Sequence, residues 1–190
     1  WLHDSFLTAG SDILLTNSFG GTSFRLKLHD AQDRVSELNR AAAKLACQAV
    51  GIHMARTGKK KLVAGSIGPT GELFEPLGAL THDAAVAAFT EQARALADGG
   101  VDVLWIETMS SNEEVGAAVV AARATGLPVC VTMTFDTAGR SMMGVTPDVF
   151  ARFATAAGAN FIGANCGIGP AELLHSVQGI VPAAGELPVV

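Results

Sequence analysis

The sequence predicts an α/β fold built on a parallel sheet. Short apolar runs rich in β-branched residues alternate with longer Ala-rich amphipathic runs, without a linker or a change in composition. Strict alternation of strands and helices is typical of parallel sheets with right-handed crossovers. Polar residues also follow the carboxyl ends of nearly every apolar run, and no G-x-G-x-x-G follows the first. This distribution favours a TIM (β/α)8 barrel over an open doubly wound sheet, which concentrates its site at one switch point.

The predicted strands are nearly continuous apolar runs, as expected when helices cover a parallel sheet. They cover residues 12–19, 61–68, 101–108, 129–135 and 160–166, and another strand begins at 187–190.

The predicted helices lie between these runs, and a short one at residues 2–9 precedes them. Residues 35–56 have apolar side chains at spacings of three and four, namely Val35, Leu38, Ala42, Leu45 and Ala49. Later helices begin with N-terminal signals at Thr81, Ser111, Thr146-Pro147 and Gly169-Pro170.

The strand count indicates an incomplete barrel. A closed barrel has eight strands and about 250 residues, whereas this chain has 190 residues and begins with a predicted helix. We therefore expect one domain over residues 1–190, incomplete at both ends. The first strand and the last one to two βα units are expected to be missing.

Composition excludes several functional classes. The formal net charge is −5, and Lys59-Lys60-Lys61 is the one basic cluster, so no nucleic-acid partner is expected. No apolar run has the roughly 18 residues that a membrane span needs. The cysteines Cys47, Cys130 and Cys166 are too few for a secreted disulfide framework, which favours reduced thiols and a cytoplasmic location.

Cys166 is the thiol best placed for chemistry. It ends a predicted strand between glycines and precedes a helix start, where a thiolate and a ligand are both favoured. A buried cysteine that only packs is the alternative from the residues alone. Cys47 lies mid-helix and Cys130 at the start of its strand, about 20 Å from the opposite end, so both are interpreted as packing residues. The five histidines include no pair at metal-ligand spacing.

Seven motifs, in order along the chain, resemble the homocysteine S-methyltransferase family. The similarity is closest to the homocysteine module of cobalamin-dependent methionine synthase and to its stand-alone bacterial relatives. The motifs are Thr16-Asn17-Ser18-Phe19-Gly20, Glu37-Leu38-Asn39-Arg40-Ala41-Ala42, Gly65-Ser66-Ile67-Gly68-Pro69-Thr70-Gly71, Glu75-Pro76-Leu77-Gly78, Ile106-Glu107-Thr108, Thr134-Phe135-Asp136 and Gly163-Ala164-Asn165-Cys166.

The resemblance implies a barrel in which three cysteines hold Zn²⁺. One comes from the sixth strand, which Cys166 matches, and an adjacent pair near the eighth strand is expected beyond the end of this chain. Zinc would keep the homocysteine thiol ionised for methylation to methionine. No catalytic residue is expected beyond this zinc site, and residues 1–190 alone should be inactive.

The resemblance also implies a substrate pocket. Glu107 matches the carboxylate that binds the homocysteine ammonium, and Thr16 and Asn17 are expected to line the pocket. Asn165 is also assigned to substrate binding. Two other roles stay open for it, namely orienting the neighbouring cysteine and making a structural hydrogen bond. Ser66, Asp136 and Thr146 are further pocket candidates, because they lie at the same face of the predicted barrel.

The methyl donor is expected to be methylcobalamin on a separate domain or protein. Betaine and S-methylmethionine are the alternatives. The chain has no Tyr, and Thr108 follows Glu107 where the animal betaine enzymes have Tyr. Two other classes of function remain as alternatives. One is an inactive barrel that serves as a binding module, and the other is a barrel enzyme that uses Glu107 and Asp136 as acid and base. The oligomeric state is open.

Overall fold

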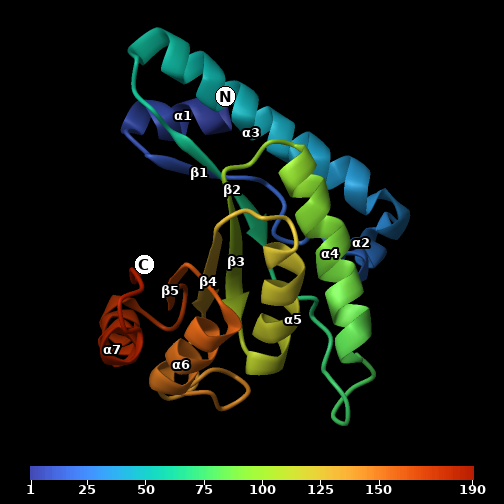
Figure 1. The fold of residues 1–190 in the computed structure, drawn as a ribbon, viewed down its shortest axis with the longest axis vertical. Coiled ribbons are helices and arrows are strands. Elements are labelled where there is room, and N and C mark those ends of the chain that lie inside the picture. Colours follow the sequence, from blue (N-terminus) through green and yellow to red (C-terminus); the bar gives the residue numbers. More distant parts are fainter.

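The strands form one parallel sheet in the order of the chain. A computed structural model describes residues 1–190 (Figure 1). The sheet order is β1-β2-β3-β4-β5, every neighbouring pair is parallel, and Val189 adds a parallel bridge to Ile162. An order without a switch point is the order of barrel strands, so the prediction of an α/β barrel fragment is confirmed. The strands are β1 (Ile13–Leu15), β2 (Leu62–Ile67), β3 (Val103–Met109), β4 (Val129–Met133) and β5 (Phe161–Ala164).

Each strand is followed by at least one helix, and the helices pack side by side along the sheet (Figure 1). Thr81 and Ser111 cap α4 and α5 by accepting backbone N–H groups, whereas α6 and α7 begin at the predicted Pro147 and Pro170 without a side-chain cap. None of the helices carries an apolar stretch long enough to cross a bilayer. They are α1 (Leu2–Ala9), α2 (Ser23–Leu26), α3 (Val35–Thr57), α4 (His82–Asp98), α5 (Asn112–Arg123), α6 (Pro147–Ala157) and α7 (Pro170–Ile180).

The two faces of the sheet have different surroundings. The main hydrophobic core joins the sheet to its helices and includes Leu104, Ile106, Val131 and Ile162. A second, smaller apolar cluster contains Ala64, Val103 and Cys130, with Trp105 and Phe161 packed against it. Successive strand residues point to opposite faces, so the second cluster lies on the face that a closed barrel encloses.

Helix α3 buries a stripe that shares only Val35 with the one whose apolar spacing predicted the helix. Leu45 is 60% exposed, as is Ile52 two helical turns later. The buried stripe is Val35, Asn39, Ala43, Ala46, Val50 and His53. Small alanines allow close packing here, since a Cβ on Gly99 after α4 would collide with Ala43. The helix was therefore predicted correctly, but the stripe with the larger leucines does not form its packed face.

Glu114 ties helix α5 to the loop that follows β2. Its carboxylate is 4% exposed and accepts hydrogen bonds from the Thr70 backbone N–H at 2.8 Å and from Thr70 Oγ1 at 2.6 Å. Ser111 caps the same helix turn by accepting from the Glu114 N–H at 3.1 Å. Burial raises the pKa of Glu114 above its ordinary 4.5, although the bonds from Thr70 oppose the shift.

The raised pKa of Glu114 predicts a pH-dependent effect of Glu114→Gln. The folded state binds the Glu114 proton more tightly than the unfolded state, so ionisation destabilises the wild type as pH rises above about 4.5. Glutamine keeps an acceptor for Thr70 and does not ionise. The free energy of unfolding of the variant relative to wild type should therefore rise between pH 4 and pH 7 in urea titrations. Glu113→Gln, on the exposed side of the same turn, is the control and should show no such trend.

Candidate functional site

The ends of β1, β2 and β3 bring three of the predicted pocket residues together. Ser66 Oγ donates a hydrogen bond to Glu107 Oε1 at 2.6 Å, and the Ser66 N–H donates to Thr16 Oγ1 at 2.9 Å. Ser66 is 2% exposed, and Glu107 is half-buried. Residues 16, 66 and 107 thus form one hydrogen-bonded row across three strands.

The segment after β1, which contains Asn17, is held by two buried side chains from neighbouring helices. Asn39 Nδ2 on α3 donates to the Gly21 carbonyl at 2.8 Å, and Gln92 Nε2 on α4 donates to the Ser18 carbonyl at 2.7 Å. The two amides also bond to each other at 3.1 Å. A Cβ at Gly21 would collide with both, so glycine is required there for the close approach.

The end of β5 places Asn165 among residues of β3 and β4. Asn165 Oδ1 accepts from the Thr108 N–H at 3.0 Å and from Thr132 Oγ1 at 2.7 Å, and Asn165 Nδ2 donates to Thr108 Oγ1 at 2.7 Å. The same Nδ2 lies 3.2 Å from Cys166 Sγ. Because Thr108 follows Glu107 directly, the hydrogen bonds of Asn165 connect the backbone beside the Glu107 carboxylate with the Cys166 thiol.

The three thiols lie in different environments. Cys166 is exposed at the strand end, whereas Cys130 is fully buried. Burial, together with the nearby Glu107 charge, raises the pKa of Cys130 to about 12. Burial also raises the pKa of Cys47, whose Sγ lies 3.2 Å from the Gly100 carbonyl. Burial therefore favours the protonated thiol at Cys47 and Cys130, and Cys166 is the most exposed of the three.

The residues of this chain do not complete a metal site. No group of three or more His, Cys, Asp or Glu side chains is close enough to hold an ion. Zinc in a structural or catalytic site takes at least three protein ligands, and Cys166 offers one thiol. The chemistry of Cys166 suits one position of a zinc site, but the chain supplies no second or third ligand.

Two weaker pocket candidates lie outside the hydrogen-bonded rows. Asp136 is exposed, and its Oδ1 accepts from Thr137 Oγ1 at 3.1 Å. Thr146 precedes α6, and its hydroxyl donates to Asp148 rather than to a site residue. Neither contacts Glu107 or Cys166 through a hydrogen bond.

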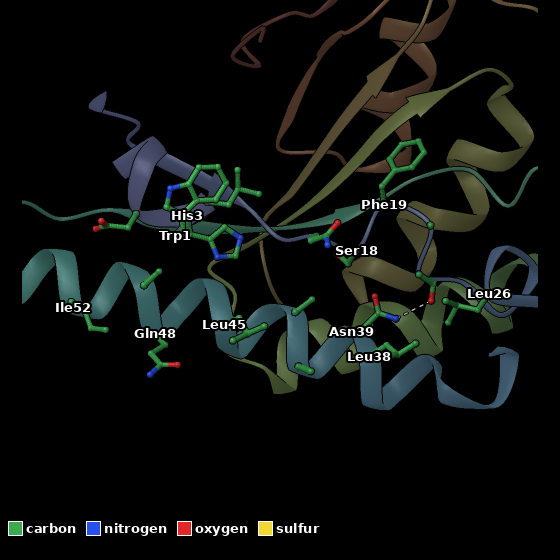
Figure 2. A pocket seen from close by; sticks show the side chains of 18 of the residues that line it. Trp1, His3, Ser18, Phe19, Leu26, Leu38, Asn39, Leu45, Gln48 and Ile52 are labelled. Carbon is green, nitrogen blue, oxygen red and sulfur yellow. Dashed lines mark hydrogen bonds between the residues drawn. The ribbon is translucent and has the colours of Figure 1, made fainter. Parts of the chain in front are cut away.

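A large groove of about 1160 Å³ is lined by α3, by the start of α1 and by the segment after β1 (Figure 2). It runs along α3, and Leu38, Leu45 and Ile52 of that helix line it. Trp1, which directly precedes α1, also lines it. Asn17 is the predicted site residue that borders it. Glu107 and Cys166 are not among the residues that line the groove, so its size does not mark the position of either side chain.

Sequence reasoning missed Thr132, Asn39 and Gln92. Thr132 lies in a run of β-branched residues, where threonine is common for its strand propensity alone. Its one signal is alternation, because Thr132 shares a sheet face with Thr134 two residues later. Asn39 lies within one of the seven family motifs, but no role was predicted for it. Gln92 had no local signal, since a polar residue in an amphipathic helix is usually on the exposed face.

Comparison with known proteins identifies the family. The family model for homocysteine S-methyltransferase matches residues 1–190. Among solved structures, the metallated form of the homocysteine methyltransferase MmuM from Escherichia coli superposes with a TM-score of 0.84 at 22% identity, covering 99% of this chain and 68% of that one. Its oxidized form gives a TM-score of 0.80 at 24% identity and the same coverage.

Proteins outside the methyltransferases also share part of this fold. Dihydrodipicolinate synthase from Oceanobacillus iheyensis aligns with a TM-score of 0.55 at 14% identity, covering 98% of this chain and 51% of that one. At these identities the structural matches support the fold, whereas the family model covers the whole chain. The chain therefore belongs to the homocysteine S-methyltransferase family.

Proposed function

We propose that this protein transfers a methyl group to the thiol of homocysteine and so forms methionine. The observation that carries the proposal is the Glu107 carboxylate, which Ser66 holds at the same strand-end face as the exposed Cys166 thiol. Family membership supplies the substrate class. Three free cysteines and a substrate that reacts through its thiol also suit a reducing compartment, so the cytoplasm is the proposed location.

Glu107 is proposed to bind the substrate ammonium. Ser66 donates to Oε1, which leaves Oε2 free to accept an N–H of the ammonium. A charge-assisted bond of this kind is stronger than one between neutral groups. Thr16 and Asn17 are proposed to line the neighbouring part of the pocket, because Thr16 is bonded to the same Ser66 and Asn17 follows it. The amino-acid end of homocysteine would then be fixed, with its thiol free to reach the Cys166 side.

Zinc is proposed as the cofactor of the complete protein, with Cys166 as one ligand. Soft thiolates suit zinc, and the relative described as metallated has the same fold. The described residues supply a single ligand, so the remaining two are proposed to come from other parts of the protein. Residues 1–190 alone are accordingly proposed to be inactive.

Methylcobalamin on a separate domain or protein is the proposed methyl donor. A betaine site would need aromatic rings around the quaternary ammonium. The residue after Glu107 is Thr108 and the chain has no Tyr, which disfavours an animal-type betaine site. S-methylmethionine is the second candidate. Methionine formation measured with each donor in turn separates the three.

Glu107→Gln tests the proposed ammonium contact. Glutamine keeps the size and the Ser66 bond but removes the charge, and a hydrogen bond between charged groups contributes about 1.5–3 kcal/mol. The KM for homocysteine should therefore rise about 10- to 100-fold, with a smaller change in kcat, in assays of the full-length protein. Glu113→Gln, which changes an exposed carboxylate, is the matched control. An unchanged KM would show that Glu107 does not bind the ammonium.

Cys166→Ser tests the proposed zinc ligand. In the full-length protein, zinc measured by elemental analysis should fall from about one ion per chain to well below one, because a thiolate ligand is lost. Cys47→Ser, which changes a thiol away from the strand ends, should keep its zinc. Retention of zinc by Cys166→Ser would remove Cys166 from the site. Methionine formation by the zinc-free protein would point to an acid–base reaction. If the zinc-loaded protein forms no methionine with any of the donors, an inactive binding module would be favoured.

A further inference from the structure

Strand β3 contains an irregularity at its functional end. In the pairing of β3 with β4, Ile106 is opposite Val131 and Met109 is opposite Met133. Two residues of β3, Glu107 and Thr108, therefore face the single residue Thr132. An extra residue of this kind is a β-bulge, which redirects a side chain and leaves a backbone group outside the regular ladder.

The side chain of Asn165 binds the bulge directly. Its Oδ1 accepts the Thr108 N–H at 3.0 Å, and its Nδ2 donates to the hydroxyl of the same residue at 2.7 Å. Thr108 has a φ of 63°, and Cys166 has a φ of 60°. Both are uncommon for residues other than glycine, and such conformations persist where surrounding contacts hold them. Asn165 contacts one of these residues and precedes the other.

The hydrogen-bonding capacity of Asn165 is fully used. A side-chain amide has two acceptor sites on its oxygen and two N–H donors. The Thr108 N–H and Thr132 Oγ1 occupy the oxygen at 3.0 and 2.7 Å. Thr108 Oγ1 and Cys166 Sγ accept from the nitrogen at 2.7 and 3.2 Å. A direct contact between Asn165 and a substrate would therefore have to break one of these four bonds.

We propose that Asn165 is a positioning residue that holds the Glu107 bulge and the Cys166 thiol in one fixed arrangement, and that it does not itself bind homocysteine. This assignment rests on the proposed function for the role of Glu107. It replaces our expectation of a substrate contact with a link between the two functional strand ends. Thr108 is part of the same link, because its hydroxyl and its N–H both bond to the Asn165 amide.

A double-mutant cycle between Asn165→Ala and Thr108→Val tests the link in the full-length protein. If both residues act through the same pair of bonds, each single variant should lower kcat/KM for homocysteine at least about tenfold. The kcat/KM of the double variant should then lie within about threefold of that of the less active single variant. Asn160→Ala is the matched control. Asn160 Oδ1 accepts from the Val129 N–H at 2.8 Å at the other end of β5, and its loss should leave kcat/KM within about twofold.

A result in which Thr108→Val behaves as wild type while Asn165→Ala raises KM would overturn the positioning role. Asn165 would then be a substrate ligand. Additive losses in the double variant would likewise contradict a shared bond.

Amide hydrogen exchange tests the bond without relying on activity. Exchange at the Thr108 N–H should accelerate at least about tenfold in Asn165→Ala, because the N–H loses its acceptor. Asn165→Asp keeps an acceptor oxygen and should restore protection of Thr108, but not kcat/KM, because it cannot donate to Thr108 Oγ1 or Cys166 Sγ. Unchanged exchange in Asn165→Ala would refute the link. If the wild type transfers no methyl group, the proposed function fails, while the exchange result still decides whether Asn165 holds the bulge.

Discussion

Parallel pairing of the strands in chain order is the constraint on which the rest of the structure depends. Every strand must run in the same direction, so the helices return the chain to the start of the next strand and all carboxyl ends meet at one edge. Thr16, Ser66 and Glu107 come from three strands, yet they bond in a row at this edge. A polar site can therefore be assembled from residues about 50 and 40 positions apart in the chain.

Polar side chains at this edge are held by one another. Ser66 is almost fully buried between Thr16 and Glu107, and Asn165 bonds to Thr108 and Thr132. A buried polar group that loses its partner is costly, so each of these residues restricts the conformation of the next. The carboxylate and the thiol are thereby held in fixed positions, and under the proposed function this would lower the cost of orienting a substrate.

Helix α3 and the segment after β1 illustrate how tertiary contacts alter local patterns. The apolar run at residues 12–19 predicted one long strand, but β1 covers Ile13–Leu15. The Thr16 N–H still bonds to the Ala64 carbonyl of β2, but further along the carbonyl groups of Ser18 and Gly21 accept from the Gln92 and Asn39 side chains. Those two amides lie on the buried faces of their helices, and on α3 the larger apolar side chains face the groove (Figure 2).

By itself the sequence determined the alternating fold, most helix starts, and the place of Glu107 and Cys166 at strand ends, because these follow from periodicity and capping within a few neighbouring residues. Only the tertiary structure decided what those residues touch. The bonds from Thr108 and Thr132 to Asn165 span 57 and 33 positions in the chain. The bulge at Glu107 depends on the register with β4. No local pattern encodes either feature, since both arise from the strand that packs alongside.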